Sequence, residues 1–162
     1  MATDRSAATR RDFLARSGCL AGSAAALSVM RIAPAGATPQ ALQDAIRQIV
    51  GEAAVQPGKV RLDVPALVEN GNAVPLTVSV DSPMSAADHV KAVHVLNEKN
   101  PQPHVVSVTL GPRAGRAAFS TRIKLADSQQ VVALAEMSDG SFWSGGADVI
   151  VTLAACVEDL VR

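Results

Sequence analysis

The sequence predicts an all-β fold: an antiparallel β-sandwich with a short N-terminal helix and a C-terminal arm. From residue 59 onward, apolar residues recur at every second position, which is the period of a half-buried strand. Groups of Gly, Pro, Asn and Asp interrupt this pattern at intervals of about 8–12 residues, as in sandwiches built from short strands. No helical period returns after residue 51, which favours an antiparallel arrangement.

The first 37 residues have the layout of an export signal. Arg10 and Arg11 are followed by a Phe-Leu pair, which is typical of twin-arginine export. A mildly apolar run at residues 18–30 precedes a small-residue cleavage site at 35–37. The run is shorter than the ~20 residues that a membrane span needs. We therefore expect residues 1–37 to be removed, leaving a periplasmic protein with no membrane anchor.

Removal of this segment leaves 125 residues, enough for one domain with a modest core. This mature chain has 10 basic and 13 acidic residues, a net charge of −3. Nucleic acids and anionic membranes bind clustered positive charge, so neither is an expected partner. The sequence contains no Tyr, so Val, Leu, Ile and Ala must build the core.

The first expected element of the mature chain is a helix at residues 40–50. Leu42, Ile46 and Ile49 recur at helical spacing, and Gly51 can end the helix. We expect it to pack on an edge of the sandwich or against a partner.

Strands follow, each bounded by turn residues. The first begins at residue 59, and the next, at 74–80, has Pro75 near its start, where a missing N–H is tolerated. Asp139-Gly140 predicts a hairpin turn before the last part of the sandwich. The remaining strands are expected at 89–98, 104–110, 116–125, 129–137 and about 147–153, with turns at 69–72, 81–84, 100–103 and 111–112.

The arm, residues 154–162, holds Cys156, the only cysteine left once Cys19 is removed with the signal. No internal disulfide is then possible, and a single thiol in an exported protein suggests intermolecular bonding or a reactive role. The alternative is a buried small hydrophobe. Its place beyond the last strand, near the chain end, counts against burial.

No other residues form a catalytic, cofactor or metal motif. His89 and His94 are five apart on one expected strand, which points them to opposite faces, so we expect surface or edge histidines and no metal site. Arg116 and Arg122 share strand parity, and we expect them on a solvated face. The sequence contains no nucleotide-binding glycine motif and no nucleophile elbow, so we expect neither a cofactor nor catalytic activity.

Six segments together resemble the SoxY family, the cysteine-bearing subunits of the SoxYZ carrier of periplasmic sulfur oxidation. They follow the family's order and are spread over the whole mature chain. They are 69–75 (ENGNAVP), 80–84 (VDSPM), 91–94 (KAVH), 98–101 (EKNP), 120–126 (STRIKLA) and 135–140 (AEMSDG).

The resemblance implies an immunoglobulin-like sandwich at residues 38–153 and a swinging arm at 154–162. It also implies a heterodimer with a SoxZ-like subunit. Cys156 matches the cysteine that carries a sulfur-containing intermediate, thiosulfate or a related compound, between periplasmic sulfur-oxidising enzymes. On this hypothesis the chain is a carrier without catalytic activity of its own.

The arm departs from the family's Gly-Gly-Cys-Gly-Gly ending. Ala154 and Ala155 precede Cys156, and Val157 and Glu158 follow it, which is similar to SoxY-related paralogues with an Ala-Ala-Cys-Ile-Glu arm. Alanine is stiffer than glycine, and carboxylates beside the thiol disfavour the thiolate and repel an anion.

Three functions remain open on these grounds. The first is the sulfur carrier. The second is an interaction module that binds a SoxZ-like subunit but has lost the arm chemistry. The third, a thiol-redox protein, is disfavoured because the mature chain has no resolving cysteine.

Overall fold

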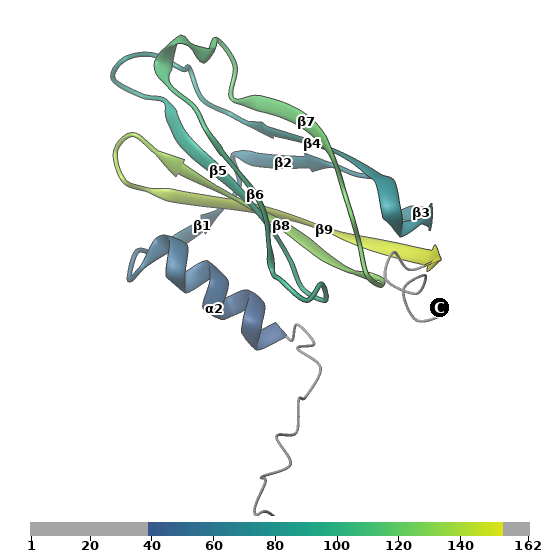
Figure 1. Ribbon diagram of the computed structural model, residues 1–162. Coiled ribbons are helices and arrows are strands. Elements are labelled where there is room, and N and C mark those ends of the chain that lie inside the picture. Colours follow the sequence, from purple (N-terminus) through teal and green to yellow (C-terminus); the bar gives the residue numbers. More distant parts are fainter. Residues whose placement is uncertain (1–38, 154–162) are drawn as a thin grey trace, which may run out of the picture. The chain divides into compact units, whose positions relative to one another are not determined.

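The computed structural model describes residues 39–153, which form a two-layer β-sandwich with one helix on an outer face (Figure 1). The expected all-β class with a short N-terminal helix is confirmed. The expected export signal and arm lie outside the described residues. No helix formed by residues 39–153 is long and apolar enough to cross a membrane.

Two sheets make the sandwich. The larger has the strand order β1-β9-β8-β5-β6, with β3 also paired to β9, and the smaller has the order β2-β4-β7. In chain order the elements are α2 (Pro39–Val50), β1 (Val55–Pro57), β2 (Val60–Asp63), β3 (Leu67–Asn70), the 3-10 turn η2 (Gly71–Ala73), β4 (Val74–Val80), β5 (Val90–Asn97), β6 (His104–Thr109), the 3-10 turn η3 (Pro112–Ala114), β7 (Ala118–Ile123), β8 (Gln129–Met137) and β9 (Phe142–Leu153).

The main core lies between the sheets and follows the period of two. In β4, every second residue from Val74 to Val80 is buried, and the residues between them are not. Aliphatic side chains from both sheets complete this core, in keeping with the scarcity of aromatic residues. Its most deeply buried members are Val74, Leu76, Val78, Val90, Val93, Val95, Leu125, Val131, Ala133, Ala135 and Val149.

Helix α2 covers the outer face of the larger sheet. Leu42 and Val50 form a second apolar cluster with Leu96, Leu134 and Phe142. The expected packing on an edge was therefore wrong, and packing of the helix against a partner stays a prediction. Strands β5 and β8 are apolar on both faces at this point, because one face contacts the sandwich core and the other contacts the helix.

The expected end of the helix is confirmed. Gly51 has a φ of +63°, and its N–H donates to the carbonyl oxygen of Arg47 at 2.8 Å. This left-handed closure is the usual way in which glycine ends a helix. The expected hairpin turn is also present, with Gly140 at a φ of +83° between β8 and β9.

Strands β4 and β8 have the expected bounds, whereas three features of the larger sheet were not expected. Strands β1 and β3 are additional, and both pair with β9 in parallel. Strand β9 begins at Phe142 rather than near residue 147. The early start of β9 was not predicted because Gly145 and Gly146 interrupt the alternating pattern, and glycine is uncommon inside strands.

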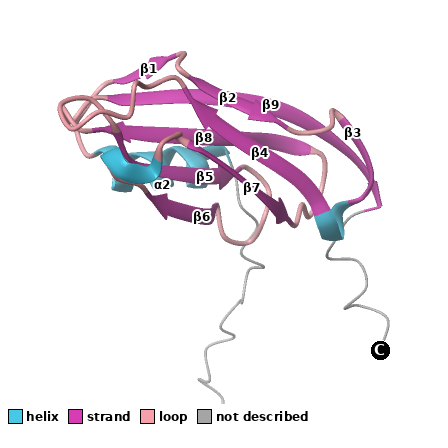
Figure 2. Ribbon diagram, turned by 90° about the horizontal axis from the view of Figure 1, so that it is seen from above, coloured by secondary structure: helices cyan, strands magenta, loops and turns pink. Residues whose placement is uncertain are grey.

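The two sheets approach each other closely at Gly145. A Cβ atom there would lie 2.3 Å from the carbonyl oxygen of Val60, closer than atoms can pack. Strand β2 therefore passes directly over β9 at this point, and the two strands run along each other in Figure 2. Lys59 adds a second contact, with its Nζ 4.5 Å from the centre of the Trp143 ring.

Gly145→Ala is expected to destabilise the fold by about 1–3 kcal/mol, because the added methyl group forces the β2 backbone away from β9. Urea unfolding of the mature protein measures this change. Gly146→Ala is the matched control, since its added Cβ would lie 3.6 Å from its nearest neighbour, the carbonyl oxygen of Val131. Equal stability of the two variants would contradict the close approach.

Candidate functional site at the base of the arm

The structure describes strand β9, which ends at Leu153, directly before the residues expected to form the arm. The residues expected to serve the arm and export lie outside the described residues. They are Arg10, Arg11, Ala154, Ala155, Cys156, Val157 and Glu158.

Near its end, β9 loses β8 on one side and gains β3 on the other, the side on which β1 lies along its first part. Its antiparallel pairing with β8 ends where Val149 lies opposite Gln129. From there β3 is the neighbour, running parallel, with Leu67 opposite Ile150 (Figure 1). The last residues before the arm are therefore held by a short strand of their own.

Side-chain hydroxyls hold the same residues from both sides. The N–H of Val151 donates to Ser128 Oγ at 2.9 Å, and that hydroxyl lies 3.4 Å from the Val151 carbonyl, to which it donates. On the other side, Thr152 Oγ1 donates to the carbonyl of Glu69 at 3.1 Å. We call Ser128 and β3 together the arm-base clamp.

An ion pair between Asp127 and Lys99 lies next to Ser128 and holds its backbone. Asp127 accepts a hydrogen bond from the Ser128 N–H at 2.6 Å, and its carboxylate lies 3.2 Å from Lys99 Nζ. The bond from Ser128, followed by the bond from Lys99, lowers the pKa of Asp127. The carboxylate therefore stays charged well into the acid range and continues to hold the turn in place.

Asn100 fixes the loop that leads to Ser128. Its side-chain amide donates to the carbonyl of Lys124 at 2.8 Å, and its oxygen accepts from the N–H of Ala126 at 2.9 Å and from Gln129 Nε2 at 2.8 Å. The Asn100 side chain thus bonds to three residues of one short segment, Lys124, Ala126 and Gln129. The polar residues around the arm base are satisfied by each other, which fits a structural role.

Exposed apolar side chains surround the arm base. Leu67, Ile150 and Leu153 are 62%, 58% and 68% exposed, and they are the large hydrophobic residues left exposed among residues 39–153. Leu67 and Ile150 are cross-strand partners. We call these three residues the arm-base patch. Leu153 is three residues from Ile150 on the same strand, so the two side chains point to opposite faces, and the patch lies around the end of β9 rather than on one face. Exposed apolar groups gathered at one place commonly mark interaction sites.

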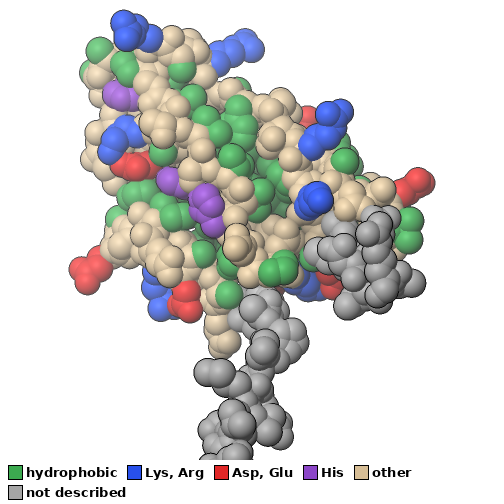
Figure 3. Space-filling view, viewed as in Figure 1, with side chains coloured by type: hydrophobic (Ala, Val, Ile, Leu, Met, Phe, Trp, Pro, Cys, Tyr) green, Lys and Arg blue, Asp and Glu red, His purple; other side chains and the backbone are tan. Residues whose placement is uncertain are grey.

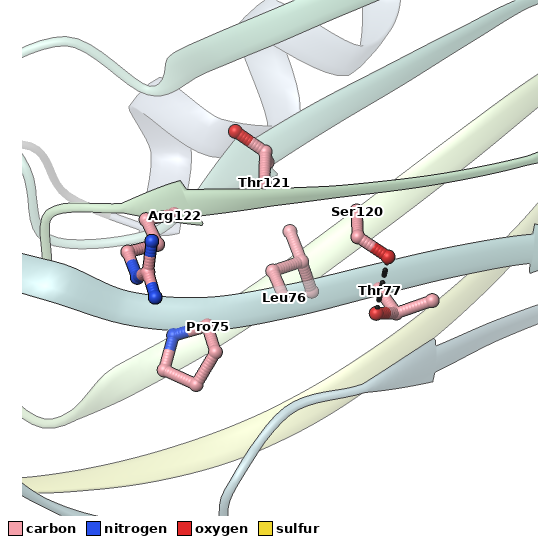
Figure 4. A pocket seen from close by; sticks show the side chains of 6 residues that line it. All are labelled: Pro75, Leu76, Thr77, Ser120, Thr121 and Arg122. Carbon is pink, nitrogen blue, oxygen red and sulfur yellow. Dashed lines mark hydrogen bonds between the residues drawn. The ribbon is translucent and has the colours of Figure 1, made fainter.

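Arg122 lines a hollow on the outer face of the smaller sheet. In Figure 4 its guanidinium lies near Pro75, and Thr77 and Ser120 are joined by a hydrogen bond of 2.8 Å between their hydroxyls. Arg122 is the one charged residue among those that line the hollow, so no base is present there to activate a hydroxyl. Arg116 precedes β7 and is also exposed, in agreement with a solvated face.

The histidines fall into a single residue and a pair. His89 precedes β5, whereas His94 of β5 and His104 of β6 lie together, with ring centres 6.4 Å apart. Burial, and then the charge of His104, lower the pKa of His94, while Glu136 opposes this shift. The described part of the chain contains no cluster of three or more His, Cys, Asp and Glu residues suited to a metal ion.

The pair of His94 and His104 was not predicted from the sequence. The spacing of His89 and His94 concerns one strand only, whereas His104 approaches His94 from the neighbouring strand. A pairing register for 89–98 and 104–110 would have been needed to find the pair, and the sequence alone does not supply one.

Comparison with known proteins identifies one family and several similar folds. The family model described as "Sulfur oxidation protein SoxY" matches residues 46–156. The structure of the sulfur carrier protein SoxY from Chlorobium limicola f thiosulfatophilum aligns with a TM-score of 0.60 at 25% sequence identity, covering 70% of this chain and 98% of that chain. No curated protein gave a significant match.

The superoxide reductase (neelaredoxin) from Ignicoccus hospitalis also has a similar fold. It aligns with a TM-score of 0.52 at 17% identity, covering 58% of this chain and 80% of that chain. At this identity the likeness shows the fold alone.

Ser128→Ala is expected to loosen the end of β9, because the backbone N–H and carbonyl of Val151 both lose a partner. The loss is about 1 kcal/mol for each of the two hydrogen bonds, which together correspond to roughly 30-fold faster local exchange of the Val151 amide proton. Hydrogen exchange followed by NMR measures it. Ser120→Ala, which removes a hydroxyl from the other sheet, is the control, and unchanged exchange at Val151 in Ser128→Ala would show that β3 alone holds the strand.

Proposed function

The chain belongs to the SoxY family, and we propose that it is a carrier that holds a sulfur-containing group covalently on Cys156 while partner enzymes act on that group. The observation that carries this proposal is the extent of the family match, which runs through the sandwich and reaches Cys156. The similar protein from Chlorobium limicola f thiosulfatophilum is itself described as a sulfur carrier. The resemblance seen in the sequence segments is thereby confirmed at the level of the family.

A carrier needs a fixed base and an accessible attachment atom. The arm-base clamp supplies the base, because Ser128 and β3 hold the residues up to Leu153. Cys156 follows three residues later. The polar groups at this end of the sandwich bond to each other, which supports a carrier that relies on other proteins for acid–base chemistry.

The proposed cargo is thiosulfate or a related sulfur compound. Joining thiosulfate to Cys156 forms a sulfur–sulfur bond and releases one proton and two electrons. A partner enzyme must accept those electrons, since the described residues include no redox group. Ala154, Ala155 and Glu158 distinguish this arm from a glycine-rich one, so we propose that its enzymes accommodate a stiffer and more acidic arm.

We further propose that the protein works in the periplasm after twin-arginine export, as a heterodimer with a SoxZ-like subunit. The arm-base patch supports a protein partner at this end of the sandwich. Its three large aliphatic side chains would gain from burial, and they lie on the strands that lead to the arm. A partner bound there would place its surface next to the cargo residue.

The intact mass of the protein isolated from its native periplasm tests the carrier function. We expect a mass increase that disappears with reductant and maps to Cys156, because a sulfur–sulfur bond is reducible. Cys156→Ser is the control and should show no adduct. A bare thiol in cells that are oxidising sulfur compounds, together with normal growth of the Cys156→Ser strain, would favour the interaction module without arm chemistry.

Ile150→Asp is expected to weaken binding of a SoxZ-like subunit at least about tenfold, because a charge in a buried apolar contact is costly. Co-expression followed by size-exclusion chromatography or calorimetry measures binding, and the melting temperature of the free subunit reports its folding. Asp148→Ala, an exposed change on the same strand, is the control. Unchanged affinity in Ile150→Asp would place the partner elsewhere on the sandwich.

A further inference from the structure

The two histidines that the sheet brings together form a candidate metal site. We propose that His94 and His104 bind a divalent transition-metal ion, Zn²⁺ or Cu²⁺, at the open edge of the larger sheet. The proposal is independent of the sulfur-carrier function, because it concerns β5 and β6 and not the arm.

A β-bulge creates the pair. Strands β5 and β6 pair regularly from Ala92 and Thr109 to Val95 and Val106, and then the register shifts so that Leu96 lies opposite His104. Val105 is the extra residue. His104 and Ser107 are three apart and would point to opposite faces of a regular strand, but the bulge returns His104 to the face of Ser107.

The ring nitrogens of the pair converge on one point. His94 Nδ1 lies 2.6 Å from Ser107 Oγ, and His104 Nε2 lies 2.7 Å from the same oxygen. The two nitrogens are therefore at most 5.3 Å apart, the sum of these two distances. Histidine nitrogens bind Zn²⁺ at ~2.0–2.1 Å, which puts two of them about 3.4 Å apart in a tetrahedral site. Side-chain rotations that turn Ser107 aside and draw the rings together would bring both nitrogens into range.

The chemistry of the donors selects the ion. Neutral imidazole is a ligand for zinc and copper, and hard oxygen-seeking ions such as Mg²⁺ are not expected at a pair of histidines. Glu136 of β8 lies close enough to His94 to act on its charge, and it is held by an ion pair with Lys91. The Glu136 carboxylate would favour a cation between the rings, although the Lys91 ammonium paired with it offsets part of that attraction.

The site is open on its outer side. Strand β6 is an edge strand and His104 is exposed, and two histidine side chains adjoin on the face seen in Figure 3. Because the described residues offer no third strong ligand at this point, water or a ligand from outside must fill the other coordination positions. We infer an exchangeable ion rather than a structural one.

Calorimetric titration of the untagged, mature Cys156→Ser protein with ZnCl₂ or CuCl₂ alone tests the proposal. The Cys156→Ser background removes the thiol, which would otherwise compete for the metal. We expect one ion per chain, and an affinity at least about tenfold weaker in His94→Gln and in His104→Gln. The matched control is His89→Gln, which should bind as the parent protein does.

A fourth variant separates metal binding from a structural role of the pair. Ser107→Ala removes the hydroxyl that bridges the rings and should bind the metal as tightly as the parent or more tightly, because the nitrogens lose a competing partner. Melting temperatures without metal show whether each variant folds. No saturable binding by the folded parent, or equal binding by the parent and both histidine variants, would overturn the proposal.

Discussion

Strand β9 is the element on which the rest of the structure depends. It pairs with β8 inside the larger sheet, accepts β1 along its first part and β3 along its last part, and passes under β2 at Gly145. The close approach at Gly145 brings the two sheets together on one side of the sandwich. The same strand ends at Leu153, so the strand that joins the sheets is also the one from which the proposed arm would continue.

The elements with regular alternation could be predicted from the sequence, and those set by long-range contacts could not. Strand β4 alternates buried and less buried residues without a break, and its bounds were predicted correctly. Strand β1 has three residues and exists because Val55 meets Phe142 of β9, which no local pattern reveals. The early part of β9 was missed for a related reason, since glycine weakens a strand pattern where a close approach requires it.

The candidate site also has one part that the sequence could suggest and other parts that depend on long-range contacts. Cys156 could be proposed as the carrier residue from the sequence, because a lone thiol and a family resemblance are properties of the sequence itself, and its role stays a prediction. The arm-base clamp could not, because Ser128 and Val151 are far apart in the chain and meet only in the folded sheet. The histidine pair also required the fold, since a one-residue bulge decides which face His104 takes.

The larger sheet has two free sides, and each bears one of the proposed sites. One side carries the short strands β1 and β3 with the arm-base patch, and the other is β6 with the histidines. Free strand edges attract unwanted pairing, and proteins limit this with short strands and bulges. Strand β3 is short and β6 contains the bulge, so both edges follow this pattern.

The short strand and the bulge also leave side chains exposed at the two edges. These are Leu67 and Ile150 at the end of β9, and His94 and His104 at the bulge. Because β9, β8 and β5 separate the two sides, a change that removes one site leaves the strands of the other intact, and the two proposals can be tested in one protein without interfering.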